Sequence, residues 1–132
     1  MSSDHFVVPL ADEQVGGLES DFVIVEWTDS GEGERDWIAA LHVHHRDDEA
    51  WYVLEGRLRF QLGDEMREAG PGEAVFAPKG TPHAYGNARR GERVRYLLVT
   101  TPKIRALVHA LHEPGASDYD AIFRAHDSES LV

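Results

Sequence analysis

Residues 42–56 read His42-Val-His44-His-Arg-Asp-Asp-Glu49-Ala-Trp51-Tyr-Val-Leu-Glu-Gly56. His42 and His44 are two positions apart in an apolar run, and alternate residues of a strand share one face, so both imidazoles should point the same way. Glu49 follows a polar turn and begins the next apolar run, which lets its carboxylate return beside the two rings. The stretch therefore predicts two strands, a short turn between them and three potential metal ligands.

A second stretch, residues 72–87, reads Gly72-Glu-Ala-Val-Phe-Ala-Pro78-Lys-Gly80-Thr-Pro-His83-Ala-Tyr85-Gly-Asn87 and adds a third imidazole. Three histidines and one carboxylate form a mixed nitrogen and oxygen donor set, which suits Fe(II), Mn, Ni, Zn, Co or Cu(II). The chain has no cysteine, so thiolate sites and disulfides are excluded. A His-x-His pair alone is weak evidence, and the metal hypothesis depends on the four residues together.

Short β-branched and aromatic runs punctuated by turn residues occupy the middle of the chain. They cover residues 22–27, 37–43, 49–54, 57–62, 66–69, 74–77, 83–85 and 94–101. A series of this kind is typical of an antiparallel barrel or sandwich. Residues 1–20 show little periodicity and should form an irregular arm that can add an edge strand.

The pattern changes at Pro102 to helical spacing. Ile104, Leu107 and Leu111 fall on one face of a first predicted helix, and Asp118 can cap a second. We therefore expect one domain over residues 1–132, with an arm at 1–20, a β-barrel at 21–101 and a helical tail at 102–132.

The two quoted stretches resemble the two sequence motifs of the cupin superfamily, with the motif spacings kept. The matching positions are His42, His44, Glu49, Gly56, Gly72, Pro78, Gly80, His83 and Asn87. One position departs, because Asp36 stands where the family usually has a glycine, and Gly31 or Gly33 could supply a shifted turn. The resemblance implies an all-β fold, the cupin double-stranded β-helix or jelly-roll barrel, with two short C-terminal helices. It also implies that His42, His44, Glu49 and His83 are metal ligands.

Cupins include dioxygenases, isomerases, decarboxylases, lyases, sensors and storage proteins, so the fold leaves the activity open. The chain resembles the building block of quercetinase-like dioxygenases. We therefore expect a metal-dependent dioxygenase acting on a small oxygenated or aromatic molecule, with one divalent transition metal ion, Fe(II) being favoured. The alternatives are a non-oxidative isomerase, lyase or cyclase, and a small-molecule-binding cupin without catalysis.

Individual residues of the predicted site have further expected roles. Glu49 is a candidate catalytic residue as well as a ligand, because its carboxylate can accept a substrate proton. Trp51 and Tyr85 share strand parity with Glu49 and His83, so they are candidate walls of a substrate pocket, although core packing explains them equally well. Arg57 and Arg59 share a strand face and could meet a carboxylate substrate, or simply face solvent.

Charge limits the partners. The chain has 24 acidic and 13 basic residues, for a net charge of −11, which repels nucleic acid and anionic membranes. The expected partners are a small-molecule substrate and a second copy of the chain, since many cupins form homodimers through edge strands. No apolar run reaches the roughly 20 residues needed to span a bilayer, and the first residues do not resemble a signal peptide. By elimination we expect a cytoplasmic protein.

Overall fold

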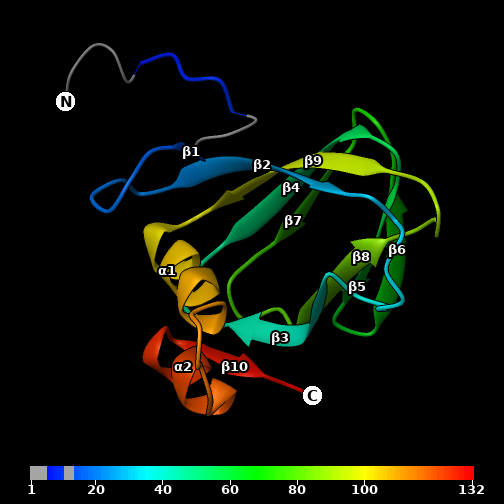
Figure 1. Cartoon of the computed structure of the whole chain (residues 1–132). Helices are drawn as coiled ribbons and strands as arrows, with labels where there is room; N and C mark the ends of the chain where they lie inside the picture. The colour runs from blue at the N-terminus through cyan, green and yellow to red at the C-terminus, as the bar shows by residue number, and fades with distance from the viewer. Residues whose placement is uncertain (1–5, 11–13) are drawn as a thin grey trace.

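Two five-stranded antiparallel sheets face each other in the computed structural model, which describes residues 6–10 and 14–132 (Figure 1). The first sheet has the order β1 (Gln14–Val15), β2 (Val23–Asp29), β9 (Val94–Thr100), β4 (Glu49–Glu55), β7 (Ala74–Ala77). The second has the order β10 (Ser128–Ser130), β3 (Ala39–His44), β8 (His83–Asn87), β5 (Leu58–Leu62), β6 (Glu65–Ala69). The predicted jelly-roll fold is confirmed.

Alternating burial shows why these segments are strands. Along β9, the side chains of Val94, Tyr96, Leu98 and Thr100 are buried and the intervening ones are partly exposed. Each strand thus presents an apolar face to the opposite sheet, as period-two patterning requires. The core holds a group of aromatic rings in contact, namely Trp51, Phe60, Tyr85 and Tyr96.

Two glycines make turns that no other residue would fit. Gly56, between β4 and β5, has φ of +78°, and a Cβ there would lie 2.3 Å from the Arg93 carbonyl oxygen. Gly31 has φ of +80°, and its Cβ would lie 2.4 Å from the Glu92 carbonyl oxygen. Left-handed backbone favours glycine. Gly31 therefore provides a tight turn upstream of Asp36, where the family glycine is missing.

The C-terminal tail contains the two expected helices, α1 (Pro102–Leu111) and α2 (Tyr119–Ala125). Thr101 caps α1 by accepting a hydrogen bond from the Ile104 N–H, and Asp118 caps α2 in the same way through Ala121. None of the helices in the described ranges is long and apolar enough to cross a bilayer.

After α2 the chain returns to the second sheet as β10, an element that the sequence did not predict. β10 pairs antiparallel with β3, so that Ser128 lies opposite His44 and Ser130 opposite His42. In Figure 1 the two helices and β10 lie beside the end of the barrel that β3 forms. The tail is thereby joined to the strand that carries two of the predicted ligands.

Candidate metal centre

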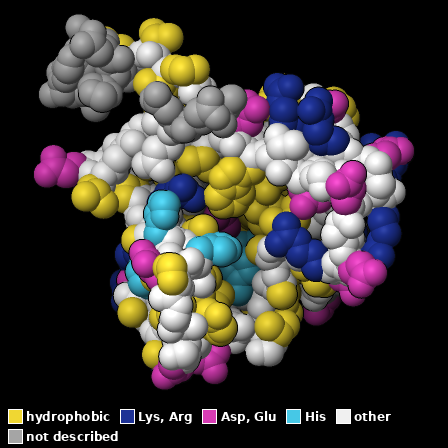
Figure 2. Space-filling model, viewed as in Figure 1, with side chains coloured by type: hydrophobic (Ala, Val, Ile, Leu, Met, Phe, Trp, Pro, Cys, Tyr) yellow, Lys and Arg dark blue, Asp and Glu magenta, His cyan; other side chains and the backbone are white. Residues whose placement is uncertain are grey.

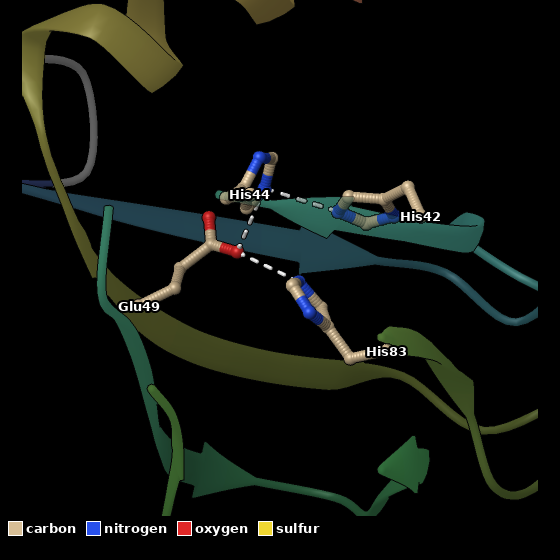
Figure 3. Close-up of side chains that lie close together, drawn as sticks. All are labelled: His42, His44, Glu49 and His83. Atoms are coloured by element: carbon tan, nitrogen blue, oxygen red, sulfur yellow. Dashed lines mark hydrogen bonds and ion pairs between the residues drawn. The ribbon is translucent and has the colours of Figure 1, made fainter. Parts of the chain in front are cut away.

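The four predicted ligands form one buried cluster. His42 and His44 lie on β3 and His83 on β8 in one sheet, whereas Glu49 begins β4 in the other. Their ligand atoms all lie within 4.8 Å of one another, and all four side chains are buried (Figure 3). The antiparallel register places His42 directly opposite His83. The barrel therefore converges on one point from both of its sheets.

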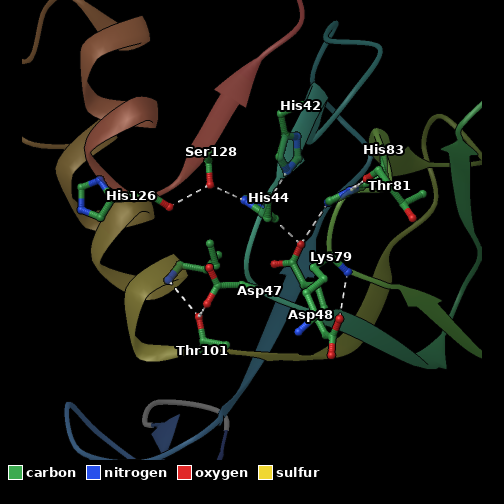
Figure 4. Close-up of polar contacts among 12 residues, drawn as sticks. His42, His44, Asp47, Asp48, Lys79, Thr81, His83, Thr101, His126 and Ser128 are labelled. Carbon is green, nitrogen blue, oxygen red and sulfur yellow. Dashed lines mark hydrogen bonds and ion pairs between the residues drawn. The ribbon is translucent and has the colours of Figure 1, made fainter.

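Hydrogen bonds set the same tautomer on all three histidines. His42 Nδ1 donates to the Ala40 carbonyl oxygen over 2.7 Å, and His83 Nδ1 donates to the Thr81 carbonyl oxygen over 2.9 Å. His44 Nδ1 lies 2.7 Å from Ser128 Oγ, whose hydroxyl donates to the His126 carbonyl oxygen (Figure 4). A neutral imidazole protonated at Nδ1 carries its lone pair on Nε2. Each ring thus presents a ligand atom to the centre of the cluster.

This arrangement fits a cation. His42 Nε2 and His44 Nε2 lie 3.1 Å apart with both Nδ1 atoms already used as donors, so two lone pairs face each other. Glu49 Oε1 lies 3.1 Å from His83 Nε2 and 3.4 Å from His44 Nε2. Acceptors crowded in this way repel one another unless a positive charge lies between them. The donor set suits a divalent transition metal ion, and its identity stays open.

The protonation states also suit a metal. Burial, together with the nearby His83 and His44, lowers the pKa of His42 to about 4. Burial alone would raise the pKa of Glu49, but in the metal-free protein hydrogen bonds and charge attraction from His44 and His83, when their Nε2 atoms carry a proton, lower it to about 2. His42 is therefore neutral and Glu49 ionised at neutral pH. Those are the forms that bind metal without first losing a proton.

A network of polar contacts ties the turn between β3 and β4 to its surroundings (Figure 4). Thr101 Oγ1 donates to Asp47 Oδ1 over 2.9 Å, which links this turn to the N-terminus of α1. Asp48 Oδ1 accepts from the Lys79 N–H over 2.8 Å, and the Gly80 N–H donates to the His44 carbonyl oxygen. These contacts hold His44 and Glu49 at fixed separation, a role that outer residues play in metal sites.

A cavity of about 750 Å³ reaches this cluster, with His42, His44 and Glu49 in its wall. Figure 2 shows histidine side chains within a hollow that is bordered by hydrophobic side chains. The apolar lining comes mainly from β2, the segment before β3, β9, α1 and α2, and includes Trp27, Ile38, Leu98, Ile104, Leu107 and Phe123. The site can therefore hold a mostly apolar molecule against His42, His44 and Glu49.

The two predicted pocket residues have different positions. Tyr85 lines the cavity, whereas Trp51 is buried in the core and is not part of the cavity lining. The Trp51 ring packs 5.5 Å from that of His83 and 5.3 Å from that of Tyr85, so it supports a ligand from behind. Sequence reasoning missed Trp27, although Trp27 shares strand parity with the buried Val23 and Val25.

Arg57 and Arg59 lie outside the cavity. Arg57 pairs with Glu68 at 2.7 Å, and the Arg59 guanidinium stacks over the Trp37 ring at 4.1 Å. Ser128, which holds His44, was also missed. Its short strand has no apolar alternation that would have signalled it.

Comparison with known proteins supports the fold. Residues 32–100 match the cupin domain family, and the chain belongs to that family. The chain is 38% identical over 47 residues to the uncharacterized protein MJ1618 of Methanocaldococcus jannaschii, covering 36% of this chain and 38% of that relative's length.

Two solved structures are similar to the barrel. KdgF from Halomonas sp. has a TM-score of 0.55 and 24% identity, covering 68% of this chain and 77% of its own. The polyketide cyclase RemF from Streptomyces resistomycificus has a TM-score of 0.51 and 34% identity, covering 64% of this chain and 57% of its own. The first similarity concerns the fold alone. The second adds sequence likeness over 64% of this chain.

Proposed function

We propose that this cupin is a mononuclear metal enzyme that catalyses a non-oxidative cyclisation or isomerisation of a small, largely apolar molecule bearing oxygen groups. The observation that carries the proposal is the mostly apolar cavity of about 750 Å³ that reaches three of the four convergent ligands, His42, His44 and Glu49. A cavity of that size encloses a molecule of a few rings, and a small number of polar groups in such a site fix its orientation.

His42, His44, Glu49 and His83 would hold the metal ion. Such an ion supplies Lewis-acid polarisation of a carbonyl or enol oxygen. The apolar walls exclude water and orient the body of the substrate. Only Oε1 of Glu49 contacts the histidines (Figure 3). With a pKa of about 2, Glu49 is a weak base, so it would accept a proton only from a strongly acidic substrate group.

Tyr85 gives the cavity wall a neutral polar group, which a second tyrosine behind it, Tyr96, contacts. The Tyr85 and Tyr96 hydroxyl oxygens lie 2.9 Å apart, and only one of the two hydroxyls can donate to the other. Burial raises the pKa of both groups, so both stay protonated at neutral pH. Tyr85 lines the cavity and can therefore offer a substrate oxygen a hydrogen bond without a change of charge.

The likeness to RemF favours a cyclase-type reaction over others. The dioxygenase expected from the sequence is the second candidate. Its support is the donor set, since three histidines and one carboxylate suit Fe(II) and leave coordination positions for substrate and dioxygen. A binding role without turnover is the remaining alternative.

The test is a turnover assay under two atmospheres. Protein purified without a His-tag is loaded separately with Fe(II), Ni, Zn or Mn and incubated with aromatic 1,3-dicarbonyl compounds, both under nitrogen and under ¹⁸O₂. An isomeric or dehydrated product that forms equally without oxygen supports the proposal. Products that carry ¹⁸O and form only with Fe(II) in oxygen support the dioxygenase. Retention of the compound unchanged in every condition supports a binding protein.

A further inference from the structure

Arg105 on α1 is a cation in the cavity wall, and no carboxylate of residues 6–10 or 14–132 pairs with it. Its Nε donates to Gln14 Oε1 over 3.3 Å, and its Nη2 lies 3.4 Å from His109 Nε2. Its Nη1 is buried and has no hydrogen-bond partner among the residues that the structure describes. The other arginine in the wall, Arg35, is neutralised by Asp29 at 3.2 Å. Within the described part of the chain, Arg105 thus has one unused donor and no carboxylate to balance its charge.

The guanidinium is also held in place. Its carbon atom lies 5.4 Å from the centroid of the Trp27 ring, a cation–π contact, and Trp27 packs edge-on against Tyr96. Gln14 on β1 accepts a hydrogen bond from Nε of Arg105. A side chain fixed by an aromatic face and an amide loses little further freedom when it binds a ligand. The geometry is that of a prepared binding group.

A partly buried cation that no described carboxylate contacts costs free energy, because it has lost part of its hydration. Burial lowers the pKa of Arg105, yet a guanidinium stays charged in proteins. Acidic residues outnumber basic ones by 24 to 13, yet the contacts of this guanidinium among the described residues are to an amide and an imidazole. The rest of the cavity wall supplies little negative charge to offset this cation, because Glu49 is the only acidic side chain that lines it among the described residues.

We propose that Arg105 binds the carboxylate of an apolar, aromatic acid whose body fills the cavity and whose other oxygen group faces His42, His44 and Glu49. The fork of Nη1 with its neighbouring N–H groups suits a planar carboxylate. This inference rests on the proposed function for the identity of the ligand as substrate. The binding step itself needs no turnover and no metal.

The test compares two probes of equal shape, 2-naphthoate and the neutral 2-naphthamide. Titration calorimetry measures both, on metal-loaded and on metal-free protein at low salt. Wild-type protein should bind the naphthoate at least about tenfold more tightly than the naphthamide, because a hydrogen-bonded ion pair is involved. In Arg105→Gln this preference should disappear, while affinity for the naphthamide stays unchanged.

Two further variants make the result specific. Arg105→Lys keeps the charge and should retain part of the preference, and Arg67→Gln, an exposed arginine on β6, should bind both probes as the wild type does. Thermal unfolding checks that Arg105→Gln is folded. Three outcomes would overturn the inference. They are equal binding of the two probes to wild-type protein, no binding of either probe at millimolar concentration, and an unchanged preference in Arg105→Gln.

These outcomes are separate from those of the proposed function. The preference for a carboxylate is measured in metal-free protein without turnover. If wild-type protein shows no such preference, the role of Arg105 is overturned and the proposed metal chemistry is unaffected. Conversely, a protein that binds naphthoate through Arg105 but never acquires a metal ion retains the inference and loses the proposed function.

Discussion

Ser128 Oγ accepts the Nδ1–H of His44 over 2.7 Å, although the two residues lie 84 positions apart in the sequence. The contact exists because β10 pairs with β3 and places Ser128 directly opposite His44. The serine hydroxyl donates in turn to the His126 carbonyl oxygen, so Ser128 can only accept from the imidazole. The C-terminal tail therefore determines which nitrogen of His44 faces the metal site.

Ser128→Ala should weaken metal binding. The substitution leaves the Nδ1–H of His44 without an acceptor, so the ring is no longer held with Nε2 toward the cluster. Loss of such an outer contact costs about 10- to 100-fold in metal affinity. Competition with a chromophoric chelator measures the change. Ser128→Thr, which keeps a hydroxyl, should have much of the wild-type affinity, and Ser117→Ala, in the exposed loop before α2, should have all of it. An unchanged affinity in Ser128→Ala would contradict the role of Ser128 in orienting His44.

Protein purified without a His-tag should contain about one equivalent of divalent metal, because four ligands from three strands converge on one point. The double variant His42→Ala/His83→Ala should lose it. Elemental analysis gives the stoichiometry and names the metal acquired. His45→Ala is the matched control, since this exposed histidine adjoins His44 but lies outside the cluster. Metal retained by the double variant, or absent from the reconstituted wild type, would reject the site.

The metal-free protein should lose stability as the pH falls from about 6.5 to about 4. The pKa of His42 is lowered from 6.5 to about 4, so in this window the unfolded chain binds more protons than the folded one. This contribution is complete above pH 6.5 and is lost on passing through pH 4. Its size is about 3 kcal/mol by linkage. Glu49, with a pKa lowered from 4.5 to about 2, adds a loss only below pH 4.5.

Urea unfolding at closely spaced pH values measures this profile. His42→Gln removes the titrating group at a similar size, and its stability should vary less between pH 6.5 and 4 than that of the wild type. A profile equally steep in both proteins would show that His42 is not the group responsible.

Gly56→Ala should destabilise the fold by about 3 kcal/mol or more, because it combines left-handed strain with a clash against the Arg93 and Val94 backbone. Gly63→Ala is the matched control. Gly63 has φ of +58°, but a Cβ there meets nothing within 4 Å, so only the conformational strain of about 1 kcal/mol applies. Denaturant unfolding compares the two, and equal losses would show that the close approach at Gly56 is unimportant.

The homodimer expected from the sequence stays a prediction, and the structure suggests which face would form it. The outer side of β4 and β7 exposes Tyr52 and Phe76, at 41% and 58%, and β7 is the last strand of its sheet. A second copy offers the same edge and the same apolar patch. Light scattering should give a dimer that Phe76→Glu disrupts and Met66→Glu, on the edge of the other sheet, does not. A monomeric wild type would reject the dimer.

Much of the fold and the candidate site was readable from the sequence, because period-two burial and the motif spacings both leave local signals. His42 and His44 share a face through strand alternation, and Glu49 and His83 follow from the spacing of the two motifs. Strand parity placed both Trp51 and Tyr85 inside the barrel but could not show that Tyr85 lines the cavity and Trp51 lies in the packed core.

What the sequence could not show depends on tertiary pairing. Ser128 lies in the segment Ser-Glu-Ser, which has no apolar alternation, and it becomes a strand only because β3 has a free edge. Helical spacing identified Ile104 and Leu107 as the buried face of α1 but gave no reason to place Arg105 in a cavity wall.

The cavity wall also includes Ser130 and Val132, the last residue of the sequence. Any polypeptide joined after Val132 therefore starts at the rim of the binding site. An oligohistidine purification tag at that position would bring competing imidazoles to the metal centre and could obstruct entry of a ligand. Tags for metal analysis and ligand titration belong at the other end of the chain, with a protease site for their removal.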